Sequence, residues 1–125
     1  MLGGGLEHFA NIPKATQEIS RVLKNSGIAI IDVPNLMFLG HIYQTFKDGS
    51  MPSEGEQQFS EQFYTYKKWK ELFESNGLQV IDCKKYNGIY GTKRFNKFVV
   101  WIWNNVIRHF VPFHLSYCFI FICKK

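Results

Sequence analysis

The chain has 125 residues, of which 46% are hydrophobic and 17% are aromatic, a composition that excludes an intrinsically disordered protein. Its 15 basic and 10 acidic residues give a net charge of +5, but the lysines are scattered and form no basic stripe or nucleic-acid-binding motif, so we expect no nucleic-acid partner. The length fits one domain over residues 1–125 with a modest core.

The cysteines and the N-terminus make a cytoplasmic location the expectation. Cys83, Cys118 and Cys123 are odd in number, lie on apolar segments and form no CxxC pair, so we expect reduced core residues and no metal site. Met1–Gly5 has neither the basic start nor the apolar run of a secretory signal. The apolar stretch Phe95–Cys123 is broken by polar residues, so we expect no membrane-spanning helix and consider a membrane partner unfavoured.

The first half of the chain predicts a helix, a strand and a second helix. A helix over Ile12–Lys24 is indicated by helical spacing of apolar residues, with Pro13 in the first turn and the left-handed conformation available to Gly27 after the last. The nearly continuous apolar run Ile28–Val33 predicts a central parallel strand. After it, Leu36–Lys47 predicts an amphipathic helix. The residues that set the two helical spacings are Ala15, Ile19, Val22 and Leu23, then Leu36, Leu39, Ile42, Tyr43 and Phe46.

The second half begins with a polar, turn-rich stretch, residues 48–64, which predicts a surface loop or lid. Thr65 is a favourable N-cap for a third helix that contains Trp69, Leu72 and Phe73 and stops at Asn76-Gly77. The remaining elements are strands at Leu78–Lys84 and Leu115–Cys123 and, between them, a helix over Phe95–Phe110 within an aromatic segment, residues 95–113. This alternation predicts an α/β fold.

Several of these segments together resemble class I S-adenosylmethionine-dependent methyltransferases, in particular the small-molecule branch of the methyltransferase type 11 and 12 kind. In that family an "LEHF"-like sequence follows a strand, a helix closes with "RVLKPGG", and the next strand runs into "PN". The matching residues are Leu6-Glu7-His8-Phe9, Arg21-Val22-Leu23-Lys24 and Pro34-Asn35, while Asn25 and Ser26 replace the usual Pro and Gly. The segment from Thr65 to Val80 looks like the family's late helix and sixth strand, and Phe119–Lys125 looks like its terminal antiparallel strand.

The resemblance implies the C-terminal portion of a Rossmann-like sheet, mixed, with an antiparallel last strand and flanking helices. The family's fifth, seventh and sixth strands are neighbours in that order, which correspond here to Ile28–Val33, Leu115–Cys123 and Leu78–Lys84. The first of these then becomes an apolar edge. We therefore expect self-association through Ile28–Val33, or its capping by Leu2–Gly5.

The resemblance also implies methyl transfer from S-adenosylmethionine to a small-molecule acceptor. The family holds this cofactor with a glycine-rich turn after its first strand and an acidic residue at the end of its second, and neither can be placed in this sequence. We therefore expect a partial domain, from a gene fragment or a decayed paralogue, that binds the cofactor weakly or not at all and is inactive alone.

Site residues follow from the resemblance. Gly4, Glu7 and His8 are placed on the cofactor side, and Asn35, Phe63 and Tyr64 on the substrate side, near strand ends where open α/β sheets bind ligands. Structural interpretations stand beside these: a helix-start acid for Glu7, a backbone partner for His8 and a turn residue for Asn35. No catalytic residue is assigned, because the sulfonium brings its own leaving group and the protein mainly aligns the reactants.

The aromatic residues leave two further hypotheses open. Those in the loop and in the last helix fit an apolar pocket for a lipid-like or aromatic acceptor, although at helical spacing they also fit a plain core. Alternatively, the chain is a non-catalytic interaction module whose helix Phe95–Phe110 docks on a partner or on a membrane surface. Liposome co-sedimentation separates a peripheral helix from a core helix.

Overall fold

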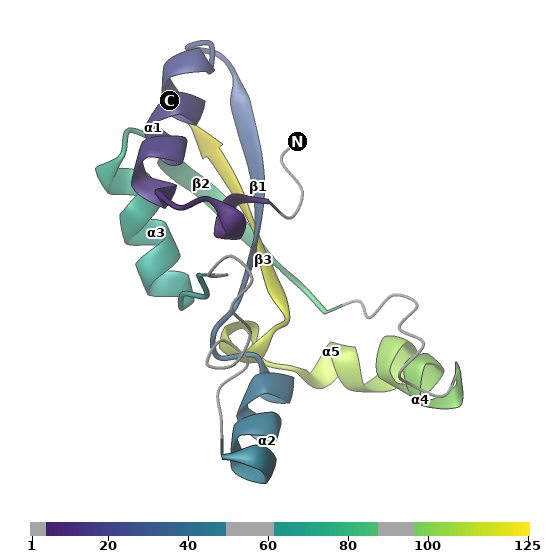
Figure 1. Ribbon diagram of the computed structural model, residues 1–125. Coiled ribbons are helices and arrows are strands. Elements are labelled where there is room, and N and C mark those ends of the chain that lie inside the picture. The colour runs from purple at the N-terminus through teal and green to yellow at the C-terminus, as the bar shows by residue number, and fades with distance from the viewer. Residues whose placement is uncertain (1–4, 50–61, 88–96) are drawn as a thin grey trace.

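The computed structural model describes residues 5–49, 62–87 and 97–125, and it alternates helices with strands (Figure 1). Gly4 and most of both the predicted 48–64 loop and the Leu2–Gly5 cap lie outside these residues. The α/β class is confirmed. In chain order the elements are the 3-10 helix η1 (Leu6–His8), α1 (Ile12–Val22), β1 (Ile28–Pro34), α2 (Leu39–Asp48), α3 (Tyr66–Ser75), β2 (Gln79–Tyr86), α4 (Lys97–Ile102), the π-helix η2 (Trp103–Ile107), α5 (Arg108–Phe110), the 3-10 helix η3 (Phe113–Leu115) and β3 (Cys118–Lys124).

The three described strands form one sheet in the order β1-β3-β2, which is the predicted order of neighbours. Both outer strands run antiparallel to β3: Ile28 pairs with Lys124 and Pro34 with Cys118 on one side, and Gln79 with Lys124 on the other. The predicted central parallel strand at Ile28–Val33 is therefore wrong. Within the described sheet β1 is an edge, and all hydrogen-bonded neighbours are antiparallel rather than mixed.

The apolar run of β1 predicted a strand buried on both faces, but only one face of β1 is buried. Ile31 and Val33 are fully buried under the helices, whereas Ile28 and Ile30, on the other face, are 61% and 38% exposed. Strand direction depends on which partner is available, and the apolarity of one strand does not encode it.

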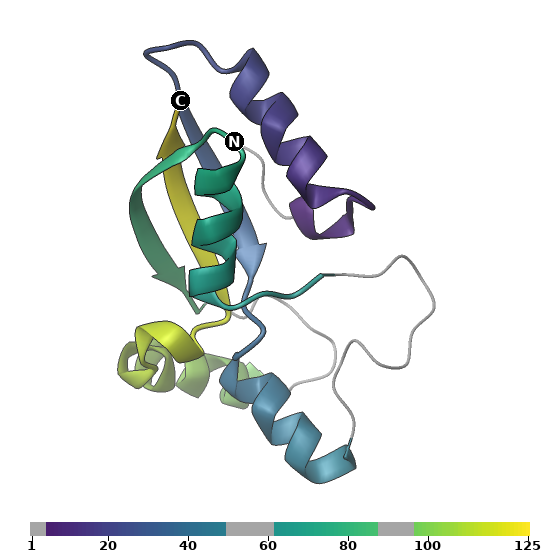
Figure 2. The ribbon, with the colours of Figure 1, turned by 90° about the vertical axis from the view of Figure 1, so that its left-hand side faces the viewer.

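Helices α1 and α3 both cover the same face of the sheet, as Figures 1 and 2 show together. Trp69 of α3 lies at the centre of this layer and donates an indole hydrogen bond to the carbonyl of Pro34 at 2.9 Å, which fixes α3 to the end of β1. Tyr66 stacks on Phe121 of β3 with ring centroids 5.6 Å apart. The buried cluster comprises Leu6, Ile12, Ile31, Val33, Trp69, Phe73, Leu78, Phe119, Phe121 and Cys123.

Helix α1 begins as predicted, and Ala15, Ile19 and Leu23 of its predicted apolar face are partly buried against the core. Asn11 caps it by accepting a hydrogen bond from the backbone N–H of Lys14 at 2.9 Å, with Pro13 in the first turn. The buried residues are Ile12, Thr16 and Ser20, whereas Val22 is exposed. The Ser20 hydroxyl donates to the carbonyl of Gly77 at 2.7 Å, so the close contact between α1 and the turn after α3 is made by small polar residues.

Gly77 and Gly27, both predicted to end helices, have different backbone conformations. Gly77 has φ +90°, as predicted for the stop of α3. Gly27, by contrast, does not have a positive φ, so that prediction is wrong. The helix already ends at Val22, and a Cβ on Gly27 would lie 2.9 Å from Cδ1 of Leu23, so glycine is needed there for close packing.

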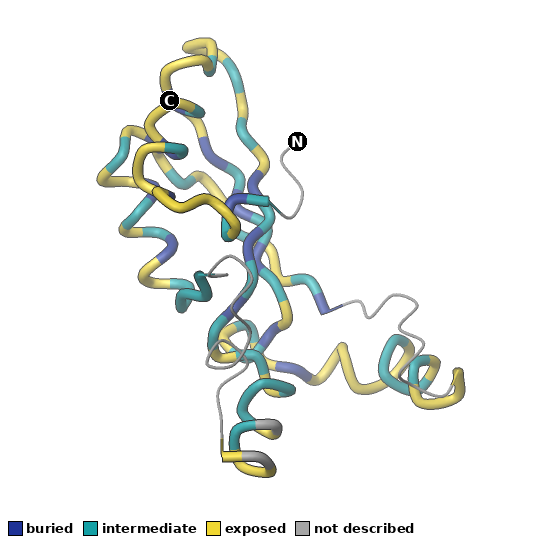
Figure 3. The backbone as a smooth tube through the Cα atoms, in the orientation of Figure 1, coloured by how far each residue is buried: buried dark blue, intermediate teal, exposed yellow. Residues whose placement is uncertain are grey.

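Helices α2 and α4, with η2 and α5, leave the sheet at the end where β1 finishes and β3 begins (Figure 1). Figure 3 shows buried backbone along the sheet, α1 and α3, and intermediate or exposed backbone along these outlying helices. The amphipathic pattern of α2 does form a helix, but Tyr43 and Phe46 on it are exposed because no described element packs against them. Within the described ranges, no helix is long and apolar enough to cross a bilayer.

Candidate functional site

Asn35, at the carboxyl end of β1, is fully buried and joins two distant parts of the chain. Its side-chain amide donates to the carbonyls of His114 and Ser116, each at 2.8 Å, and its Oδ1 accepts from the backbone N–H of Met37 at 3.0 Å. Both amide hydrogens are thus used within the protein. Asn35 lies where the resemblance puts it, but its side chain holds the entry of β3 against the exit of β1 and keeps no donor for a ligand.

The chain passes Asn35 a second time at Tyr64. These two residues form an isolated parallel bridge, in which the backbone N–H of Leu36 donates to the carbonyl of Tyr64 at 3.2 Å. The Tyr64 hydroxyl donates to Oε1 of Gln62 at 2.6 Å, and its ring meets Trp69 edge-on at 4.9 Å. The structure therefore does bring the predicted substrate-side residues Asn35 and Tyr64 together.

An aromatic cluster surrounds this strand end. Phe63, the third predicted substrate-side residue, packs edge-on against His41 at 5.4 Å between ring centroids, and His41 packs against Phe38 at 5.2 Å. Phe38 in turn contacts Tyr117 at 5.1 Å. Burial lowers the pKa of His41 and hydrogen bonding with the backbone at Leu36 and Asn35 partly opposes this, so the imidazole is neutral at pH 7.

Sequence reasoning did not select His41. It lies on α2 among residues chosen for apolar spacing, and only the fold places it against Phe63, which is 22 positions away. A histidine flanked by aromatic residues at helical spacing is the signal that was available.

Glu7 and His8, the described residues predicted on the cofactor side, lie on η1 next to β1. Nε2 of His8 is 3.6 Å from Oε1 of Glu7, and the backbone N–H of Gln62 donates to the carbonyl of Glu7 at 3.2 Å. Oε2 of Glu7 is buried and has no hydrogen-bond partner among the residues that the structure describes. The Glu7 carboxylate is therefore more than the exposed acid of a helix start.

A second carboxylate, Asp32, lies on β1. Among the described residues its Oδ1 is likewise buried without a hydrogen-bond partner, and burial raises the pKa of Asp32. Because Ile31 and Val33 point toward the helices, Asp32 points to the sheet face that α1 and α3 do not cover. Burial, followed by the charges of Asp32 and Glu7, raises the pKa of the Cys118 thiol to about 12, so this thiol is inert at pH 7.

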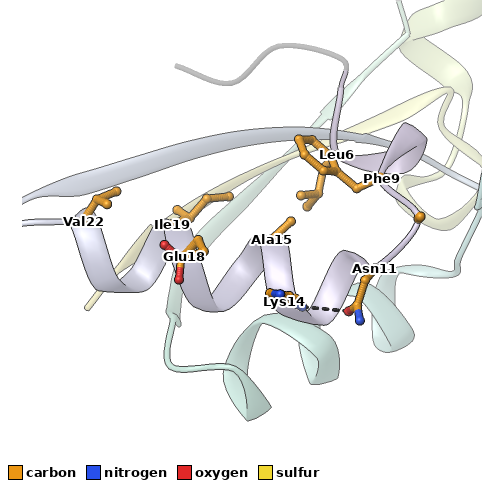
Figure 4. Close-up of a pocket in the computed structure, with 9 residues that line it drawn as sticks. Leu6, Phe9, Asn11, Lys14, Ala15, Glu18, Ile19 and Val22 are labelled. Carbon is orange, nitrogen blue, oxygen red and sulfur yellow. Dashed lines mark hydrogen bonds between the residues drawn. The ribbon is translucent and has the colours of Figure 1, made fainter.

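An open apolar groove of about 540 Å³ runs along α1 (Figure 4). Leu6, Phe9, Ala15, Ile19 and Val22 form its floor and walls, and polar side chains lie only at its rim. The groove offers no converging polar groups to orient a small ligand, so it is a packing surface rather than a reaction site.

No group of three or more histidine, cysteine or acidic residues in the described part of the chain is arranged to hold a metal ion. No protein-family model matches the chain, and no curated protein matches it.

Proposed function

We propose that this chain is the acceptor-side, C-terminal portion of a class I S-adenosylmethionine-dependent methyltransferase fold that modifies a small molecule. One observation carries the proposal: the last strand, β3, lies between β1 and β2 and is antiparallel to both. The resemblance read from the sequence implies this order and this direction for the family's fifth, seventh and sixth strands. Chain-adjacent strands are neighbours in most sheets, so the insertion of the final strand between two earlier ones is informative.

The position of η1 supports the same proposal. Its Leu6-Glu7-His8 sequence carries the "LEHF" likeness, and it lies beside the edge strand β1. In the family this sequence follows the strand that neighbours β1. Helices cover both faces of a complete doubly wound sheet. Helices α1 and α3 cover one face of this sheet, as expected for a part of such a domain.

The residues at the carboxyl end of β1 suit two tasks, which are binding of the cofactor and binding of the methyl acceptor. Glu7 and Asp32 are the residues that would hold the cofactor's ammonium or hydroxyl groups, because each has a buried oxygen whose hydrogen-bonding capacity is not used among the described residues. When bound, S-adenosylmethionine would supply the methyl group and a neutral thioether as leaving group. Phe38 and Phe63 would exclude water from an acceptor, and His41, whose neutral form is favoured by burial, would take the proton that the acceptor releases.

These residues supply only part of a cofactor site. The 125 residues contain no glycine-rich turn that follows a strand and opens a helix. The chain by itself should therefore bind S-adenosylmethionine with a dissociation constant of roughly 1 mM or weaker, about −4 kcal/mol.

Amide NMR with S-adenosylmethionine at millimolar concentration tests this proposal. We expect small, saturable shifts confined to Leu6–His8 and Asn35–Leu36, lost in the double variant Glu7→Gln and Asp32→Asn. Replacement of an exposed acid, Glu18→Gln, is the matched control and should leave the shifts unchanged. No localised shift at 10 mM overturns the carboxylate site, and micromolar affinity overturns the partial-domain proposal.

A further inference from the structure

One end of the molecule presents large aromatic side chains to solvent. We call it the aromatic end and define it by α2 together with residues 97–110, which leave the same end of the sheet (Figures 1 and 2). Phe46 on α2 is 88% exposed and Phe110 on α5 is 82% exposed, and Tyr43, Phe98 and Trp101 are each more than half exposed. Exposed apolar side chains on two segments that leave the same end of the sheet make this end a candidate interaction surface.

Trp103 and Arg108 connect the helix over residues 97–110 to the end of β2. The indole N–H of Trp103 donates to the carbonyl of Asn87 at 2.9 Å, its ring meets Phe38 edge-on at 6.3 Å, and the side-chain amide of Asn87 donates to the carbonyl of Arg108 at 3.4 Å. None of residues 97–110 is buried. On the helix, Phe98 and Trp101 stack with centroids 6.4 Å apart and stay largely exposed.

The charge of this region is net positive. Lys97 and Arg108 on the helix are exposed, Lys47 lies in the last turn of α2, and Asp48, the last residue of α2, is the one acidic residue in the two segments. A second copy of the chain would bring the same positive charge to the contact and would be repelled. The complementary partner is anionic, and it must also receive exposed tryptophan and phenylalanine rings.

We propose that the aromatic end binds the surface of an anionic lipid bilayer. Exposed Trp and Phe rings beside Lys and Arg are the composition of segments that lie in the headgroup region, with rings inserted and basic groups on lipid phosphates. The helix over residues 97–110 is about 21 Å long, too short to span a bilayer, so it lies on the surface. This inference does not depend on methyl transfer, although the surface adjoins the strand end that holds Asn35.

Vesicle co-sedimentation tests the proposal with phosphatidylcholine vesicles that contain 30% phosphatidylglycerol or none. We expect the chain to bind the anionic vesicles, to bind the neutral ones at least tenfold more weakly, and to lose binding as salt rises to 0.5 M. Trp101 fluorescence should shift to shorter wavelength on the anionic vesicles only.

Two pairs of variants separate the contributions. The double variant Trp101→Ser and Phe110→Ser should weaken binding about tenfold or more, whereas Phe9→Ser, an exposed aromatic beside α1, should not change it. Lys97→Gln and Arg108→Gln should each weaken binding about fivefold, whereas Lys14→Gln and Lys24→Gln, exposed on or next to α1, should have little effect.

Other results overturn the proposal. These are no binding to anionic vesicles, equal binding to neutral ones, or binding that Phe9→Ser reduces as much as the aromatic pair. Sedimentation without lipid identifies a competing occupant, because self-association that disappears in Trp101→Ser and Phe110→Ser would show that a second copy covers this end. Circular dichroism confirms that each variant retains the wild-type helix content.

Discussion

The sheet with η1, α1 and α3, which we call the body, and the aromatic end use the same residue types for opposite purposes. In the body Trp69 is fully buried, stacks on Phe73 and donates a hydrogen bond to the carbonyl of Pro34. At the aromatic end Trp101 is 59% exposed and stacks on Phe98 of its own helix. The apolar content of a sequence therefore establishes that a core forms, while the fold decides which aromatic residues belong to it.

The largest expected difference between the two regions is in tryptophan truncation. Trp69→Ala should lower the free energy of unfolding by about 3–5 kcal/mol, because it leaves a cavity in the core and removes the partner of the Pro34 carbonyl. Trp101→Ala should change it by less than about 1 kcal/mol. Urea unfolding monitored by circular dichroism measures both. Similar losses in the two variants would mean that the helix over residues 97–110 is part of one cooperative core.

If Trp69→Ala does not fold, Trp69→Phe provides the same comparison with a smaller change. It keeps most of the apolar volume and removes the indole donor, so a loss of about 1–2 kcal/mol is expected. Trp101→Phe is its matched control and should be neutral.

A smaller difference is expected between two asparagines. Asn35→Ala should cost about 2–3 kcal/mol, because the carbonyls of His114 and Ser116 stay close to the core without their donor. Asn105→Ala, on the exposed helix, removes one hydrogen bond to the carbonyl of Trp101 and should cost less than about 0.5 kcal/mol. Thermal unfolding compares them. A neutral Asn35→Ala would show that the connection between β1 and β3 does not need this side chain.

The smallest effect concerns Asp32. Burial raises its pKa in the folded state, so the folded protein holds this proton more tightly than the unfolded chain does. The contribution of protonated Asp32 to the free energy of unfolding is complete at pH values below the ordinary aspartate pKa. It is lost as the pH rises through the pKa of Asp32 in the folded state. Asp32→Asn should therefore stabilise the protein at pH 7, by on the order of 0.5 kcal/mol after allowance for partial exposure.

The pH dependence is the control for this prediction. At pH 3, where both states carry a protonated Asp32, the variant and the wild type should unfold at the same denaturant concentration. A stability gain that is equal at pH 3 and pH 7 would contradict the electrostatic explanation. If Asp32→Asn makes the protein more stable and also reduces the NMR shifts caused by S-adenosylmethionine, Asp32 is a residue that serves cofactor binding at a cost in stability.

Local sequence signals predicted the elements well where the interacting residues are close together in the sequence. Thr65 caps α3 by accepting from Lys68, and Gly77 ends it with a positive φ. The burial of Thr16 and Ser20 on α1 was not predicted, because apolar periodicity does not count these two residues, whose hydroxyls are satisfied by carbonyls.

The candidate site was predicted less completely than the fold. Placement of Asn35 and Tyr64 at one strand end came from the resemblance, and the structure brings them into contact. The role of the Asn35 amide depends on carbonyls about 80 residues away, which no local pattern contains. The nearness of Asp32 to Cys118 depends in the same way on the pairing of β1 with β3, which sets Asp32 opposite Ile120 and Pro34 opposite Cys118.

The central place of β3 has a consequence for the order in which the chain acquires its structure. Residues 118–124 are synthesised after β1 and β2, yet they supply the hydrogen-bonded neighbour of both strands. Until then, the backbone groups of β1 and β2 have no described strand beside them, and the pairing of Ile28 with Lys124 must close the long loop between these two residues. Assembly of the sheet therefore waits for β3, and chaperones that shield extended apolar segments have their longest access to the apolar strand β1.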